Sequence, residues 1–232
     1  MSDGVPAVGE PLGGVGSIAL APDGSLVVSE QVGQVRRVTP AGVIELVAGT
    51  GEYDEAAGSG DGGPATAASL ADNAGVTVGP DGTIYVAENS RVRRITPDGI
   101  IDTIAGGDPQ SCPPAEGDTG RAIDARVCIP VAVAVGPDGS VYVGDGSEVY
   151  RIGPDGSFEY VAGQPEGASF GGDGGPAADA TLQFVTDLAV APDGTLYILD
   201  SCNHRVRRVG ADGVITTVAG SGPVCPEKEY GR

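Results

Sequence analysis

The chain carries one tight-turn signature, Pro-Asp-Gly, six times, and four of these copies recur at nearly constant spacing as the first turn of a repeat. The turn aspartates are separated by 58, 57 and 55 residues, and each copy continues through a second turn to an Ala-Gly pair. Self-similarity at one long period is typical of repeat architectures, so it limits the chain to folds made of similar units arranged side by side. The four aspartates are Asp23, Asp81, Asp138 and Asp193.

Each repeat contains four short runs of β-branched and aliphatic residues separated by turn-forming residues. This pattern is typical of strands joined by tight turns, in which Pro, Asp and Gly supply the turn conformation. It predicts a four-stranded antiparallel meander for every repeat. In the last repeat the runs lie at 188–190, 196–199, 206–209 and 215–218.

The first run of each repeat alternates large and small side chains, as in Ile18-Ala19-Leu20. This alternation predicts that both faces of the strand are buried against other sheets. In a β-propeller each sheet packs between two neighbours, and small residues let the sheets approach closely near the axis. Solenoid repeats, the rival arrangement, are usually shorter and carry one strand or a helix pair each.

We therefore predict an all-β fold, a β-propeller of four-stranded antiparallel blades, in one domain spanning residues 1–232. Four blades are expected, at about 17–49, 76–106, 131–163 and 187–220. Long connectors join them, and the segment PATAASL at 64–70 is expected to form a short helix beginning at Pro64.

Two segments resemble blades of NHL-repeat β-propellers: GVTVGPDGTIYVAENSRVRRITPDGIIDTIAGG and DSCNHRVRRVGADGVITTVAG. The connector GDGGPATAASL at 60–70 resembles the linkers of bacterial and teneurin-like NHL arrays. The resemblance covers nearly the whole chain and implies a propeller. It implies less about function, because such propellers serve as interaction platforms, sensor domains and occasionally lyases or lactonases.

The ends of the chain bear on the number of blades. The first residues match the connector motif, and the tail SGPVCPEKEYGR resembles the start of the third connector. We expect four whole repeats with adjacent termini in a closed ring. NHL propellers more often have six blades, so a six-bladed ring with missing blades is the alternative.

The charge balance limits the classes of partner. The chain has 32 acidic and 13 basic residues and a formal charge of −19, which disfavours nucleic acid and anionic membranes on electrostatic grounds. No apolar run approaches the roughly 18 residues of a spanning helix, so we expect no membrane insertion. The first residues do not resemble a signal peptide, which leaves a cytoplasmic protein or an excised domain.

Four cysteines favour an extracellular or cell-surface setting, with a cytoplasmic one as the alternative. Cys112 and Cys128 bracket one connector, while Cys202 and Cys225 lie at the same predicted end of the last blade. Of the three possible connectivities, topology favours the pairs Cys112–Cys128 and Cys202–Cys225. A zinc site is disfavoured, because the chain has no CxxC spacing and one histidine, His204.

An arginine precedes the second turn in every repeat, and this repetition argues for a structural role, because a catalytic residue is needed once. We expect salt links or hydrogen bonds from these side chains to acids at the ends of neighbouring strands. The arginines are Arg37, Arg94, Arg151 and Arg208, and the expected partners are Glu30, Glu88, Asp145 and Asp200.

Two features break the repeat near the predicted channel mouth. Asp187 begins the first strand of blade four, and Asp72-Asn73 precedes the same strand in blade two. Oxygen ligands of this kind suit Ca²⁺, and lactonase-like propellers place an acid and asparagine cluster at such a position. Asp187, Asn73 and Asp72 are therefore the candidate calcium ligands. Local capping of backbone amides is the alternative role.

The sequence favours a non-catalytic interaction module that binds a protein or glycan partner. It lacks nucleophile motifs such as GxSxG, and NHL-type Asn-His-Arg-Val sequences hold their histidine structurally. The long loops at 50–75, 107–130 and 164–186 lie on the face opposite the hairpin turns and are the expected binding surface. A calcium-dependent lactonase, hydrolase or lyase is the alternative function.

The cysteine pairing can be checked directly. Peptide mapping under non-reducing conditions should recover one fragment that joins Cys112 to Cys128 and another that joins Cys202 to Cys225. Four free thiols in protein isolated under oxidising conditions would contradict both the pairing and the extracellular setting.

Overall fold

The computed structural model describes residues 3–52, 59–71, 73–106, 120–164 and 169–222, without the side chains of residues 73 and 74. Four antiparallel sheets follow one another along the chain, and each contains a four-stranded meander. This confirms the predicted propeller blades. The strands are β2 (Val15–Leu20), β3 (Leu26–Glu30), β4 (Gln34–Val38) and β5 (Val43–Ala48) in blade one; β7 (Asn73–Val78), β8 (Ile84–Glu88), β9 (Arg91–Ile95) and β10 (Ile100–Gly106) in blade two; β12 (Pro130–Val135), β13 (Val141–Asp145), β14 (Glu148–Ile152) and β15 (Ser157–Gly163) in blade three; and β16 (Val185–Val190), β17 (Leu196–Asp200), β18 (Arg205–Val209) and β19 (Ile215–Ala219) in blade four.

The Pro-Asp-Gly turns form as the sequence predicts. In blade two, the Gly82 amide donates to the Gly79 carbonyl at 3.0 Å, and Gly82 has a φ of 85°. The Asp81 carboxylate accepts a hydrogen bond from the Thr83 amide at 3.0 Å. Because Gly adopts a positive φ without strain and Asp bonds the backbone two residues on, these residues specify the turn.

The connectors join neighbouring blades through their outer strands. The two-residue strands β1 (Val5–Pro6), β6 (Gly63–Pro64) and β11 (Gly120–Arg121) each pair with the outer strand of the blade that follows. Three 3-10 helices then contact the outer strand of the blade before: η1 (Ala65–Ala67), η2 (Ala122–Asp124) and η3 (Ala177–Asp179). The predicted helix at 64–70 is thus a single turn for which Pro64 is the N-cap.

The apolar core lies between the blades. The inner strands β2, β7, β12 and β16 lie next to one another in this order, and three clusters of buried residues fill the interfaces. The large side chains of each first strand pack towards the preceding blade. Val76, Val133 and Leu188 are therefore only 5%, 7% and 7% exposed.

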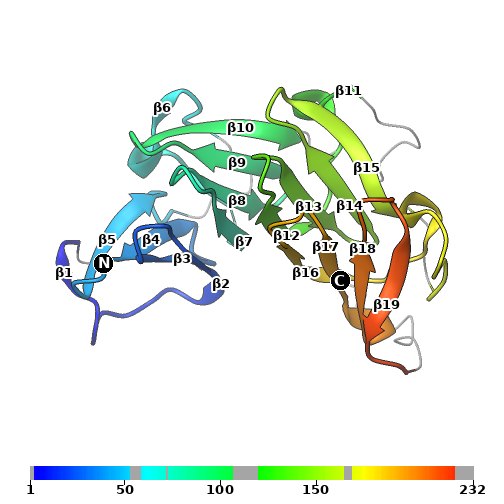
Figure 1. The fold of residues 1–232 in the computed structure, drawn as a ribbon. Coiled ribbons are helices and arrows are strands. Elements are labelled where there is room, and N and C mark those ends of the chain that lie inside the picture. Colours follow the sequence, from blue (N-terminus) through cyan, green and yellow to red (C-terminus); the bar gives the residue numbers. More distant parts are fainter. Residues whose placement is uncertain (1–2, 53–58, 72, 107–119, 165–168, 223–232) are drawn as a thin grey trace.

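The described blades form an open arc (Figure 1), with β1 and β19 at its opposite ends. Ile18, at the position of Val76 in blade one, has no preceding blade against it and is 60% exposed. At the other end Leu199 of blade four is 39% exposed. The expectation of a closed ring with adjacent ends is therefore wrong for the described residues, because the faces of blades one and four are not packed together.

The interfaces between blades depend on small side chains. A Cβ atom on Gly144 would lie 2.7 Å from Val185 Cγ1 and 3.2 Å from Ala132 Cβ. We expect Gly144→Val to lower the free energy of unfolding by about 1–3 kcal/mol, since overpacking forces neighbouring side chains to shift. Leu199→Val, at the equivalent and partly exposed position of blade four, is the matched control and should cost less. Urea denaturation measures both, and equal losses would contradict this account.

Candidate functional site

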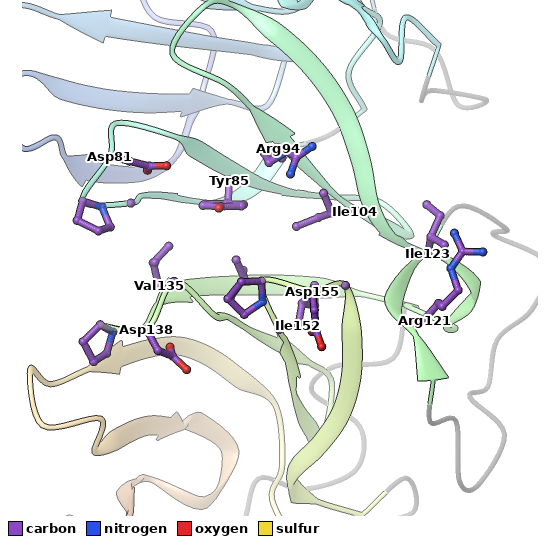
Figure 2. A pocket seen from close by; sticks show the side chains of 18 residues that line it. Asp81, Tyr85, Arg94, Ile104, Arg121, Ile123, Val135, Asp138, Ile152 and Asp155 are labelled. Atoms are coloured by element: carbon purple, nitrogen blue, oxygen red, sulfur yellow. The ribbon is translucent and has the colours of Figure 1, made fainter.

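A pocket of about 610 Å³ lies between blades two and three, and we call it the turn-face pocket. It lies at the hairpin-turn end of the blades, and Figure 2 shows its lining. The first turns of both blades, the second turn of blade three and the connector η2 surround it. The pocket is therefore on the hairpin-turn face, and Arg121 and Ile123, which belong to the loop at 107–130 that we expected on the opposite face, help to line it.

The pocket combines an apolar wall with a charged rim. Tyr85, Ile104, Val135 and Ile152 form much of the wall, and Tyr85 is half-buried. Burial raises the pKa of the Tyr85 hydroxyl, so the phenol stays neutral at physiological pH. Figure 2 shows Asp81 and Asp138 at one end, with Arg121 and Ile123 at the other. Wells of this size and composition are typical of ligand-binding pockets.

The carboxylates at the rim of the pocket form hydrogen bonds that stabilise the turns to which they belong. The Asp138 carboxylate accepts hydrogen bonds from Arg151 at 2.8 Å and from the Ser140 amide at 3.0 Å. These bonds, led by that of Arg151, lower the pKa of Asp138 to about 2. In blade two the Thr83 amide and hydroxyl lower the pKa of Asp81. Both groups are therefore ionised at any physiological pH.

The repeat arginines do not bond the acids that we expected. Arg37 bonds Asp23 and the Ser25 hydroxyl, Arg151 bonds Asp138, and Arg94 bonds Asp102 at 3.3 Å. Hydrogen bonds from Thr195 lower the pKa of Asp193, and the charge of the fourth arginine, Arg208, adds a smaller effect. These arginines thus lie at the turn ends of the blades.

Strand alternation explains the error. Arg94 is paired with Tyr85, whereas Glu88 lies on the same face of its strand as Val86, which is paired with Arg93. Because successive side chains point to opposite faces, Glu88 faces the arginine one residue earlier. The corresponding pairs are Arg36 with Glu30 and Arg207 with Asp200, while Tyr150 faces Asp145.

The arginines that lie one residue earlier in the sequence are fully buried, and those of blades two and four bond the connectors. Arg93 bonds Glu88 at 3.1 Å and the connector acid Asp61 at 2.7 Å, and also bonds the Ser59 carbonyl. Arg207 repeats this pattern in blade four with Asp200 at 3.3 Å and Asp173 at 2.8 Å. We call this arrangement, a buried arginine that bonds both a strand acid and a connector acid, the buried clamp. The Arg-Arg pair and the Asp-Gly-Gly-Pro-Ala motif are the sequence signals from which it could have been predicted.

Blade three replaces the buried arginine with Tyr150. The Tyr150 hydroxyl donates to Glu148 Oε2 at 2.7 Å, and Asp145 accepts hydrogen bonds from the amides of Cys128 and Ile129. Burial raises the pKa of both Glu148 and Asp145, and the charge of Asp145 adds to the rise at Glu148. The buried cluster is structural, since it holds the start of β12.

Of the three candidate calcium ligands, the structure describes the side chain of Asp187 alone, so the calcium site stays a prediction. Asp187 is exposed on β16 beside a central cavity of about 910 Å³, and its carboxylate accepts a hydrogen bond from the Leu188 amide at 2.9 Å. Asn73 lies in β7 without a described side chain, and Asp72 lies outside the described residues. No cluster of three His, Cys, Asp or Glu side chains suited to a metal occurs in the part of the chain that the structure describes.

Two further groups of predicted residues lie partly outside the described ranges. Cys202 is buried and Cys128 lies beside β12, but Cys112 and Cys225 are outside, so both disulfides stay predictions. Much of the loop at 107–130 is outside too. Among the described residues, no helix has the length and apolar character needed to cross a membrane.

Comparison with known proteins defines the class. The arrangement of the blades is that of the NHL-type β-propellers, and the family model for the teneurin NHL domain matches residues 39–116, 107–163 and 162–210. The chain belongs to the teneurin NHL domain family. Mouse teneurin-3 is 35% identical over 78% of the chain, and teneurin-m of Drosophila melanogaster is 32% identical over 92%. The chain spans only 7% and 9% of the lengths of these relatives.

Solved structures support the same fold at low sequence identity. Virginiamycin B lyase from Staphylococcus aureus aligns with a TM-score of 0.58 and 16% identity, covering 92% of this chain and 57% of that one. An auxiliary nutrient binding protein from Bacteroides thetaiotaomicron aligns with a TM-score of 0.61 and 14% identity, covering 84% and 47%. Since these neighbours differ from one another in function, they show the fold alone.

The buried clamp makes different predictions for two adjacent arginines. Arg93→Met leaves Glu88 buried without its counterion, so we expect a loss of about 3–5 kcal/mol in the free energy of unfolding. Arg94→Met removes a half-exposed pair and should cost less than about 1 kcal/mol. Urea denaturation compares them. The double variant Glu88→Gln with Arg93→Met should recover part of the loss, and equal losses in the two single variants would contradict the clamp.

Proposed function

We propose that the chain is a non-catalytic protein-binding module, presented by a secreted or cell-surface protein. The observation that carries this proposal is the turn-face pocket, an exposed well whose mouth departs from the repeat. Arg121 and Ile123 at its mouth stand where the other connectors have Pro64 and Thr66 or Pro176 and Ala178. Positions that serve folding alone are expected to be similar in every repeat, so these differences favour a role in binding.

The distribution of charge supports a binding role. The acids and arginines that repeat around the arc bond turns and connectors, so they are committed to the fold. Asp187 is the one acid among the described residues that line the central cavity. A single exposed carboxylate supplies too few groups for general acid and base catalysis together with metal binding. The family membership supports the same class, because the named relatives are large proteins of which this domain is a small part.

The proposal is tested with the biotinylated chain bound to streptavidin as a tetramer. Because one tetramer can bind several partner molecules at once, weak individual affinities become detectable through avidity. We expect saturable binding to a protein on the surface of intact cultured cells, lost after trypsin treatment of the cells and retained after glycosidase treatment. An unrelated protein of similar negative charge is the control for adhesion by charge alone.

Two results would overturn the proposal. Binding that glycosidases abolish would make the partner a glycan. Lactone hydrolysis that requires Ca²⁺ and is lost in Asp187→Asn would make the chain an enzyme.

A further inference from the structure

Two of the four first-turn aspartates, Asp81 and Asp193, make no ion pair with the third-strand arginine in the described residues, and of these Asp81 lines the turn-face pocket. In blades one and three, the arginine of the third strand bonds the first-turn aspartate, as Arg151 bonds Asp138 at 2.8 Å. In blade two the equivalent Arg94 bonds Asp102. The Asp81 carboxylate accepts hydrogen bonds from the Thr83 amide at 3.0 Å and its hydroxyl at 2.9 Å, and no cation of the described residues bonds it.

In blade two, side-chain length on the outer strand accounts for the missing ion pair; in blade four Arg208 is opposite Thr216, so this account applies to blade two alone. Arg94 is directly opposite Asp102 in the sheet, and Arg151 is directly opposite Glu159. The longer Glu159 reaches Arg151 at 3.1 Å while that arginine keeps its bond to Asp138. Because aspartate is one methylene shorter, the guanidinium of Arg94 must lie nearer to β10 to bond it, and the ion pair with Asp81 is lost.

The two residues that do not form this ion pair both lie at the turn-face pocket. Asp81 and Arg94 both line it, and Figure 2 shows the Tyr85 ring between them. Asp81 also lines a smaller cavity of about 250 Å³ with Arg37, but Arg37 bonds Asp23 and the Ser25 hydroxyl of its own blade. The pocket thus holds a carboxylate without a counterion beside an aromatic and aliphatic wall.

We propose that the turn-face pocket binds a lysine or arginine side chain of a partner protein, an inference that rests on the proposed binding function. The cationic head replaces the missing guanidinium at Asp81. Its methylene stem packs on Tyr85 and Val135, as long basic side chains do when their stem meets an apolar surface. The formal charge of −19 attracts basic partners and speeds their encounter.

The test uses two blocked tripeptides, acetyl-Leu-Lys-Leu-amide and the same peptide with norleucine in place of lysine. Titration calorimetry on the whole chain should show saturable binding of the lysine peptide, at least tenfold tighter than that of the norleucine peptide. Asp81→Asn keeps an acceptor for the Thr83 amide and removes the charge, so it should weaken lysine-peptide binding at least tenfold. Asp193→Asn makes the same change in blade four, outside the pocket, and should leave the affinity unchanged.

A second variant tests the ion-pair argument without removing a charge. Asp102→Glu gives blade two the outer-strand acid of blade three, so Arg94 can bond Asp81 and compete with the peptide. It should weaken lysine-peptide binding while leaving the unfolding midpoint unchanged.

Equal binding of the norleucine peptide, or equal weakening by Asp193→Asn and Asp81→Asn, would overturn the proposal. Cell-surface binding by the tetramer that is the same for wild-type and Asp81→Asn chains would overturn this pocket assignment alone. The absence of any cell-surface binding by the wild-type tetramer would overturn the binding function itself.

Discussion

The buried contact between an acid at the end of each second strand and the connector backbone is the interaction on which the fold depends. Glu88 accepts a hydrogen bond from the Ala71 amide at 2.9 Å, and Asp200 accepts one from the Gln183 amide at 2.8 Å. Each bond fixes the chain where it enters a blade. In blades two and four Arg93 and Arg207 supply a counterion to this buried carboxylate. The same guanidinium groups bond connector acids, so a single buried cation joins strand, loop and connector.

Much of this structure could be predicted because its signals are local. The spacing of Pro-Asp-Gly turns specifies the hairpins, and strand alternation specifies which residues are large. The partner of Arg94 was predicted wrongly because Glu88 shares a face with Arg93, and one residue of register decides between them. The open arc was missed for a different reason. The two ends of the chain resemble parts of one connector, but this resemblance does not determine whether the ring closes. Closure depends on whether the faces that carry Ile18 and Leu199 pack together.

The turn-face pocket could not be read from the sequence, because it depends on the angle at which two repeats meet. Its chemistry was nevertheless present in the repeat alignment, as the difference between Asp102 and Glu159 at equivalent positions. In a repeat protein, a residue that agrees with its equivalents informs about folding, and one that departs from them carries separate information. Blade three illustrates a structural departure, in which Tyr150 replaces an arginine and bonds Glu148 instead.

The exposed end of blade four shows how such departures constrain assembly. Leu199 occupies the position that Gly144 has in blade three, where a Cβ atom would come within 2.7 Å of Val185 in the next blade. Val15 is the equivalent of Val185 in blade one, because each is opposite the acid that ends the second strand. A second copy added in the same register would therefore press Val15 against Leu199. Repetition of the internal packing from copy to copy would overpack this contact and is therefore disfavoured.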